Sequence, residues 1–290
     1  MAITASMVKE LRERTGLGMM DCKKALVDAD GDMELAIEEL RKKSVLKAAK
    51  KSGRTTANGL LGLKMADDAG KAAIVEINIE TDFAAKNEKF IAFVAKVADA
   101  VFESVDGDIE ALKHSGLDKE RETLVQEIGE NISIRRGELA VAPEGGCVAC
   151  YLHTDNLKGA LVVLNTNDIE LGREVAMHIT AINPMVIRSE EISEETIGKE
   201  REIYTSQAQD SGKPPEIIEK MVEGRIRKFL SEVSLIDQPF VKEPDRKVGD
   251  LLDASNTEVI SFCRLEVGEG IEIEEEDFAA EVAAQLQESQ

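Results

Sequence analysis

The sequence predicts an α+β protein built from several domains. The first 40 residues place apolar side chains at helical spacing, whereas from Gly59 onward apolar runs of strand length are followed by helical patterns. A charged stretch at residues 189–233 predicts two helices with few apolar positions. The 290 residues also exceed the length over which one hydrophobic core usually keeps growing, so we expect two or more domains.

Residues 1–54 are predicted to form a module of three short helices followed by a basic linker. Thr4 suits the N-cap of the first helix, and T-G-L-G at residues 15–18 ends that helix. Residues 41–54 contain seven basic residues and no acidic one. We interpret this segment as solvated surface and linker, the alternative being a contact with an acidic face of a partner. The apolar stripe of the first helix is Ile3, Met7, Val8 and Leu11.

Two related α+β subdomains are predicted next, each an antiparallel sheet with helices packed on it. The first covers residues 55–142, and the second combines residues 143–188 with residues 233–264. Residues 74–101 and 161–187 share one pattern, in which an apolar run ending in Asn precedes an acidic turn and an apolar-spaced helix. Chance similarity between two strand–helix units is the alternative.

An αα-hairpin, or coiled coil, with a narrow apolar seam is predicted at residues 189–232. Its sparse seam either packs on itself or pairs between molecules, which would give a homodimer. Residues 265–290 are predicted to form a C-terminal module that ends in a helix, EDFAAEVAAQL. Residues 266–290 carry nine acidic residues and no basic one, which is typical of a solvated surface. The predicted seam positions are Ile192, Ile197, Tyr204, Ile217, Met221 and Ile226.

The charge and hydropathy of the sequence argue against nucleic acid and membranes as partners. The net charge of −21 argues against nucleic acid, because a phosphate-binding surface needs clustered Lys and Arg. No run approaches the roughly 18 apolar residues that span a bilayer, so no membrane partner is expected. The start, MAITASMVKELRERTG, has early acidic residues and lacks the uninterrupted apolar region of a signal peptide. We therefore expect a cytoplasmic protein.

The sequence contains no recognisable catalytic or metal-binding motif, and we expect no enzyme activity, no metal and no cofactor. Cys147 and Cys150 form a C-x-x-C, but the surrounding pattern is that of a strand, on which residues three apart point to opposite faces. A zinc site would also need a second pair of ligands, so both cysteines are interpreted as small buried hydrophobes. The three histidines, His114, His153 and His178, lie in different predicted elements, which disfavours a metal-dependent hydrolase.

Two places have residues typical of a contact surface. Met19 and Met20 are adjacent, so both cannot face one small core, and exposed Met is common on adaptable binding surfaces. Phe83 follows an apolar strand-like run. If a helix begins at Asp82, Phe83 joins a buried stripe with Phe90; if Asn87 is the N-cap, Phe83 lies in a turn and can project. The pattern alone favours burial, because Phe is rarely left exposed.

Two segments resemble the signature sequences of a known family, bacterial translation elongation factor Ts. They are T-G-L-G-M-M-D-C-K-K-A-L at residues 15–26 and T-D-F-A-A-K at residues 81–86. The resemblance runs through the whole chain in order, and is therefore far more specific than one motif. The further matches are I-G-E-N-I-S-I-R-R (128–136), S-G-K-P-P-E-I-I-E-K-M-V-E-G-R (211–225), Q-P-F-V (238–241) and R-L-E-V-G-E-G-I-E (264–272).

The resemblance implies a guanine-nucleotide exchange factor for elongation factor Tu, with an N-terminal module similar to ubiquitin-associated domains. It implies that Thr81, Asp82, Phe83 and Ala84 form an exposed turn that enters the GTPase near its Mg²⁺ and nucleotide. The family often has Val where this chain has Ala84. The other residues to which it gives a partner contact are Arg12, Met19 and Met20 on a helix of the GTPase, Ile128 and Gly129 in the core contact, and, more weakly, His153 and Phe278. A peptide- or chaperone-type adaptor that uses the N-terminal module and the hairpin is the alternative function, and pairing through the hairpin would allow a 2:2 assembly.

Overall fold

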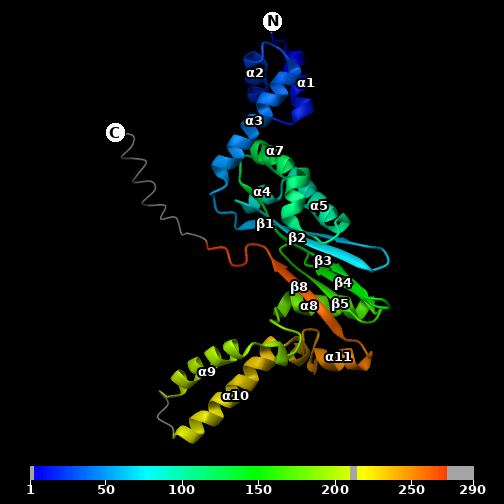
Figure 1. The fold of residues 1–290 in the computed structure, drawn as a ribbon, viewed down its shortest axis with the longest axis vertical. Coiled ribbons are helices and arrows are strands. Elements are labelled where there is room, and N and C mark those ends of the chain that lie inside the picture. Colours follow the sequence, from blue (N-terminus) through cyan, green and yellow to red (C-terminus); the bar gives the residue numbers. More distant parts are fainter. Residues whose placement is uncertain (1–2, 210–213, 273–290) are drawn as a thin grey trace.

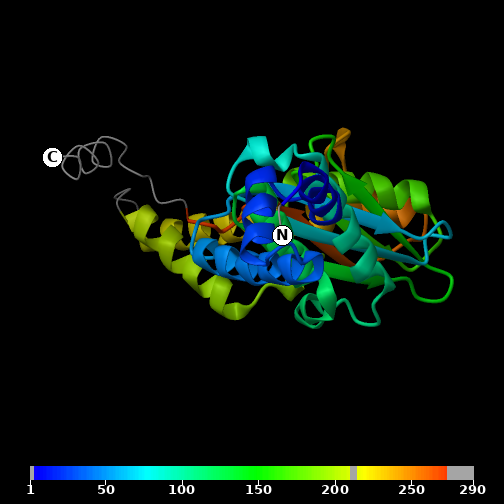
Figure 2. The same cartoon turned by 90° about the horizontal axis from the view of Figure 1, so that it is seen from above.

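The computed structural model describes residues 3–209 and 214–272. Figure 1 shows an elongated α+β molecule with a helical module at the N-terminal end, two sheets in the middle and a helical hairpin at the other end. Seen from above, the hairpin projects to one side of the sheets (Figure 2). Among the described residues, no helix is both long and apolar enough to cross a membrane.

The N-terminal module packs three helices around its own apolar cluster, which includes Leu11, Cys22 and Leu26. The Thr4 hydroxyl accepts a hydrogen bond from the Met7 amide (3.3 Å), and Gly16 ends the first helix with φ +71°, a conformation that favours glycine. The three helices are α1 (Ala5–Thr15), α2 (Met19–Asp28) and α3 (Met33–Lys51).

Most of the basic stretch is helix, and most of its side chains are exposed. Residues 41–51 continue α3 beyond the module, and Ala48 packs into the core of the first sheet. The acidic groups that face this stretch belong to the same chain: Lys43 pairs with Asp28 (3.3 Å) and Lys47 with Asp21 (3.6 Å). Only residues after the end of α3 connect it to the first strand. These two exposed ion pairs link α3 to α2 within the module.

The first sheet is antiparallel, in the order β1-β2-β3. One face carries the helices, whose stripe of Phe90, Val94, Val97 and Val101 is buried as predicted. Two short helical turns between α5 and α7 were not predicted. The elements are β1 (Asn58–Met65), β2 (Lys71–Ile79), α4 (Asp82–Ala85), α5 (Glu88–Glu103), α6 (Ile109–Leu112), η1 (Lys113–Leu117), α7 (Asp118–Ile128) and β3 (Ile132–Val141).

The second sheet, in the order β4-β5-β8, packs against the free face of the first. Leu61 and Ile74 from the first sheet meet Leu161 and Val163 from the second in one buried cluster. The outer face of the second sheet carries α8. The elements are β4 (Cys147–Leu152), β5 (Lys158–Leu164), α8 (Ile169–Ile182), η2 (Ser189–Glu191), η3 (Leu235–Asp237), β6 (Pro239–Phe240), β7 (Glu243–Lys247), α11 (Val248–Ala254) and β8 (Val259–Glu266).

The C-x-x-C pair lies on β4, and the two thiols diverge as the strand pattern predicts. Cys147 is buried against the cluster under α8, whereas Cys150 packs in the cluster between the sheets. Burial raises the pKa of both thiols. Within the described ranges, no group of three or more His, Cys, Asp or Glu side chains could hold a metal ion.

The helical hairpin consists of α9 (Glu194–Gln209) and α10 (Pro215–Val233), and its seam closes within the chain. The prediction of Ile217 as a seam residue is wrong. Its side chain is exposed, and Ile218 packs into the seam instead, because one residue further along a helix turns the side chain by about 100°. The seam residues are Ala208, Val222 and Ile226, with Ile197, Tyr204, Ile218 and Leu230 partly buried beside them.

A buried carboxylate ties the two sheets together. Glu76 lies on the face of β2 that meets the second sheet, and its side chain is fully buried. Burial alone disfavours the charged carboxylate, but four donors outweigh it and hold the pKa of Glu76 below its ordinary value. Two of these donors, Arg135 and Arg136, also donate hydrogen bonds to the backbone carbonyls of Glu269 and Glu266, respectively. The four donors are Gly268 N–H (2.8 Å), Asn78 Nδ2 (3.0 Å), Arg135 Nη1 (2.9 Å) and Arg136 Nε (2.5 Å).

A buried histidine links α8 to the base of the hairpin. The Val241 amide donates to His178 Nδ1 (3.2 Å), so Nε2 carries the proton and donates to Gln238 Oε1 (2.8 Å). Gln238 Nε2 in turn donates to the carbonyl of Glu232 at the end of α10 (2.6 Å). Desolvation by burial lowers the pKa of His178, so the folded protein keeps this imidazole neutral.

We expect His178 to make the folded state sensitive to mild acid. Because the pKa of His178 is lowered on folding, its contribution to stability is complete above the ordinary value of 6.5 and is lost as the pH falls below it. The test is the urea midpoint of unfolding from pH 7.5 to pH 5.5. His178→Gln should flatten the slope in this range, because the buried imidazole is then absent. An equal slope in His178→Gln would contradict this account.

Candidate partner-binding site

The T-D-F segment forms a one-turn helix, α4, at the end of β2. The Thr81 hydroxyl caps it by accepting a hydrogen bond from the Ala84 amide (3.2 Å). Phe83 is 83% exposed, the highest value of any Phe in the described ranges, whereas Ala84 and Ala85 are buried in the core of the first subdomain. The two alanines anchor the turn, and Phe83 points away from it.

The structure combines the two interpretations of this segment. A helix does begin at Asp82, but it ends at Ala85, and Asn87 starts the next helix by accepting a hydrogen bond from the Lys89 amide (2.9 Å). Phe83 therefore does not join the stripe of Phe90. The expectation that all of residues 81–84 are exposed is wrong at Ala84, because one turn of helix puts adjacent residues on different sides.

The loop after α7 holds the start of α4. The Glu130 carboxylate accepts hydrogen bonds from the Thr81 amide (3.0 Å) and the Thr81 hydroxyl (2.8 Å). Gly129, with φ +91°, ends α7 just before it and is exposed, while Ile128 is half-buried against the core. Two site residues predicted from separate segments, Gly129 and Thr81, are thus brought together through Glu130. Sequence reasoning missed Glu130, since no local signal pairs residues 49 positions apart.

The N-terminal module carries a second exposed group. Met19 is 59% exposed and Met20 75% exposed in the first turn of α2, and Arg12 is exposed on α1. The sequence predicted that at least one of the two methionines is exposed, and in the structure both are exposed. The core of the module takes Cys22, Ala25 and Leu26 from the same helix and leaves its first turn outside.

The remaining candidates lie elsewhere. His153 is exposed in the turn after β4 and pairs with Asp155 (3.0 Å) beside a hollow of about 500 Å³ on the second subdomain. The pKa of Asp155 is lowered, mainly by the hydrogen bond from the Leu157 amide and to a smaller extent by His153. The C-terminal helix predicted at residues 276–286 and its Phe278 lie outside the described residues.

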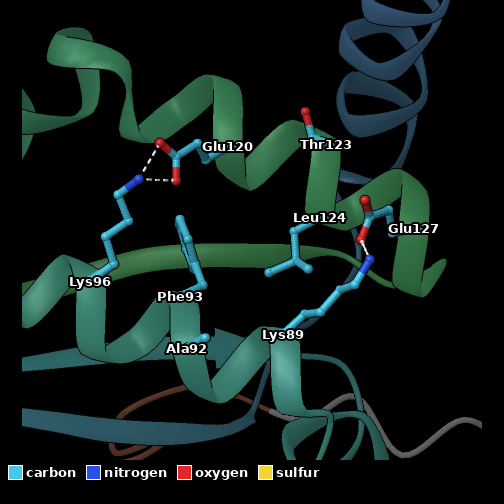
Figure 3. Close-up of a pocket in the computed structure, with 8 residues that line it drawn as sticks. All are labelled: Lys89, Ala92, Phe93, Lys96, Glu120, Thr123, Leu124 and Glu127. Carbon is cyan, nitrogen blue, oxygen red and sulfur yellow. Dashed lines mark hydrogen bonds and ion pairs between the residues drawn. The ribbon is translucent and has the colours of Figure 1, made fainter. Parts of the chain in front are cut away.

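A pocket of about 340 Å³ opens between α5 and α7 (Figure 3). Phe93 and Leu124 supply its apolar lining. An ion pair closes each end, Lys96 with Glu120 (2.5 Å) and Lys89 with Glu127 (2.5 Å).

The sequence is similar to known proteins over most of its length. The family model described as Elongation factor TS matches residues 80–269. The Elongation factor Ts of Hahella chejuensis is 55% identical over 285 residues, covering 98% of this chain and 99% of that protein. This chain belongs to the elongation factor Ts family. The Elongation factor Ts proteins of Teredinibacter turnerae and Marinobacter nauticus are 52% and 53% identical, each over at least 97% of both chains.

Membership of the elongation factor Ts family confirms the resemblance and the α+β fold class predicted from the sequence. The matched range begins at Glu80, so it includes α4, the loop after α7, β3 of the first sheet, the whole second sheet and the hairpin. The near full-length identity extends the likeness to the N-terminal module. The division into residues 1–54, 55–142, 143–188 with 233–264, 189–232 and 265–290 stays a prediction.

Proposed function

We propose that this chain is a guanine-nucleotide exchange factor that binds elongation factor Tu carrying GDP and promotes GDP release during translation elongation. The observation that carries the proposal is the 83% exposure of Phe83 on a capped turn backed by a rigid sheet. Phe is among the residue types most often fully buried, and this exposed Phe lies in the range that the Elongation factor TS family model matches. The proposed activity would operate in the cytoplasm.

Exchange of this kind needs no covalent chemistry. A protein that binds the nucleotide-free GTPase more tightly than the GDP-bound form weakens GDP binding by the same factor, because the two equilibria are linked. Phe83 would act as an apolar wedge that displaces the groups holding Mg²⁺ and phosphate, with Thr81 and Asp82 beside it and Ala84 anchoring it. The chain is therefore proposed to act by binding and not as an enzyme.

The other site residues would supply affinity. Arg12, Met19 and Met20 present a mixed basic and apolar surface suited to a helix of the GTPase. Gly129 with Ile128 would extend the contact around α4, and His153 and Phe278 would contribute more weakly. A 2:2 assembly through the hairpin remains part of the proposal, and analytical ultracentrifugation of the complex would test it.

The direct test is release of fluorescent GDP from elongation factor Tu. Catalytic amounts of this chain should accelerate release under conditions in which excess unlabelled GDP prevents rebinding. If release is not accelerated, the proposed function is wrong.

The alternative, a peptide- or chaperone-type adaptor, makes a different prediction. The hairpin projects from the sheets and closes its own seam, so removing residues 190–232 should leave α4 and the N-terminal module in place. An exchange factor should keep much of its GDP-release activity after this deletion. Complete loss of activity in a folded deletion variant would favour the adaptor.

A further inference from the structure

The N-terminal module meets the first subdomain at α7 and at the loop that follows it. Gly16, three residues before Met19, is so close to Glu127 that an added Cβ would lie 2.1 Å from a carboxylate oxygen. Ser44 on α3 donates to Gln126, and Lys51 at the end of α3 donates to the carbonyl of Gly129. The position of Met19 and Met20 relative to the first subdomain therefore depends on contacts with α7 and with Gly129, the C-cap of α7.

The chain segments that meet at this cap form one hydrogen-bonded joint, consisting of residues 51–54, 80–81 and 129–131. Asn131 is buried, and its side-chain amide donates to the carbonyl of Arg54 (3.0 Å). Its backbone amide donates to the Glu80 carboxylate (2.5 Å), which also pairs with the Arg54 guanidinium (3.3 Å). The end of α3, the end of β2 and the start of β3 are thus held at one point.

The same joint sets the direction of Phe83. Glu130 accepts both hydrogen bonds that Thr81 can donate, and the fixed Thr81 hydroxyl then caps α4 through the Ala84 amide. Without Glu130, the hydroxyl is free to rotate and the cap loses its anchor. A one-turn helix has little stability of its own, so its orientation depends on such contacts.

We propose that Glu130 and Asn131 are positioning residues that hold the Met19–Met20 turn and Phe83 in a fixed relation to each other. The inference rests on the proposed function, in which both groups engage one GTPase. Binding energy from the N-terminal module can drive the wedge into place only if the connection between them is stiff. If the joint is loose, the Met19–Met20 turn can bind the GTPase while Phe83 stays away from the nucleotide site.

The first experiment measures the joint without a partner. The sequence contains no Trp and two Tyr, so Phe83→Trp introduces a single tryptophan at the wedge, which can be excited selectively at a wavelength that the tyrosines do not absorb. Time-resolved anisotropy of this indole should show a larger fast component when Glu130→Ala is added, because α4 loses its anchor. Glu130→Gln keeps an acceptor and a donor at the same distance and should restore the slow, rigid decay. Glu122→Ala, two turns earlier on α7, is the matched control and should change nothing.

The second experiment measures GDP release with Phe83 intact. Glu130→Ala should lower the maximal rate of release by roughly 10- to 100-fold, the scale of losing a hydrogen bond to a charged group, with little change in the concentration for half-maximal rate. Glu130→Gln should recover most of the rate. The positioning role is overturned if Glu130→Ala leaves the anisotropy and the rate at wild-type values. Failure of the wild-type chain to release GDP would instead overturn the proposed function, while the anisotropy would still test the joint.

Discussion

Replacing Phe83 with alanine is expected to slow GDP release from elongation factor Tu by about 10- to 100-fold, the scale of losing an aromatic hot spot at an interface. The same change should leave the thermal unfolding transition close to wild type, because a side chain that is 83% exposed contributes little to the core. Stopped-flow fluorescence of labelled GDP and differential scanning calorimetry measure the two effects.

The matched control for Phe83→Ala is Val105→Ala. Val105 is 97% exposed in the same subdomain and lies after α5, outside the proposed site. Its replacement should leave both GDP release and thermal stability unchanged. A Phe83→Ala protein that unfolds at a much lower temperature, yet releases GDP normally when folded, would show that Phe83 is structural.

Replacing Glu76 with alanine should lower the free energy of unfolding more than any other substitution proposed for this chain. Removing one partner of a buried charge network leaves the others unpaired, at a cost of about 3 kcal/mol or more. Arg135 and Arg136 would lose their shared acceptor, and the Gly268 amide would be left without a partner in a closely packed turn. Urea denaturation followed by circular dichroism measures the change in the free energy of unfolding.

The pH dependence of the Glu76 variant has a defined sign. The pKa of Glu76 is lowered on folding, so its contribution is present above the ordinary value of 4.5 and is lost as the pH falls through the lower folded value. The wild-type chain should therefore lose stability below about pH 4.5 more steeply than Glu76→Ala. Exposed Glu138→Ala, on the neighbouring strand, is the control and should behave like the wild type. Equal acid profiles for Glu76→Ala and wild type would contradict the proposed network.

Much of the fold follows from local patterns in the sequence. The stripe of α5 and the apolar run of β2 are long and regular, so their burial could be predicted. The hairpin of β6 and β7 was missed because E-P-D-R-K at residues 243–247 has no apolar alternation and pairs with only two residues. The pattern of residues 41–54 could not show that α3 runs on to the first subdomain, because Ala48 packs there against residues far away in the sequence.

The candidate site was less accessible to sequence reasoning. Periodicity left Phe83 between core and surface, and the T-D-F-A-A-K resemblance tipped the expectation towards exposure. What the sequence could not supply is the support of α4, since the hydrogen bonds from Thr81 to Glu130 cross 49 positions. Nor could it show that Gly129 and Met19 belong to one connected assembly, because the contacts run through α7 and α3.

The central claim, that Phe83 couples binding of this chain to loss of nucleotide, is tested most directly by comparing two affinities. Isothermal titration calorimetry gives the Kd of the chain for nucleotide-free elongation factor Tu and for the GDP-bound form. The wild-type chain should bind the nucleotide-free form more tightly, and Phe83→Ala should bring the ratio of the two Kd values towards one. A ratio unchanged by Phe83→Ala would contradict the account.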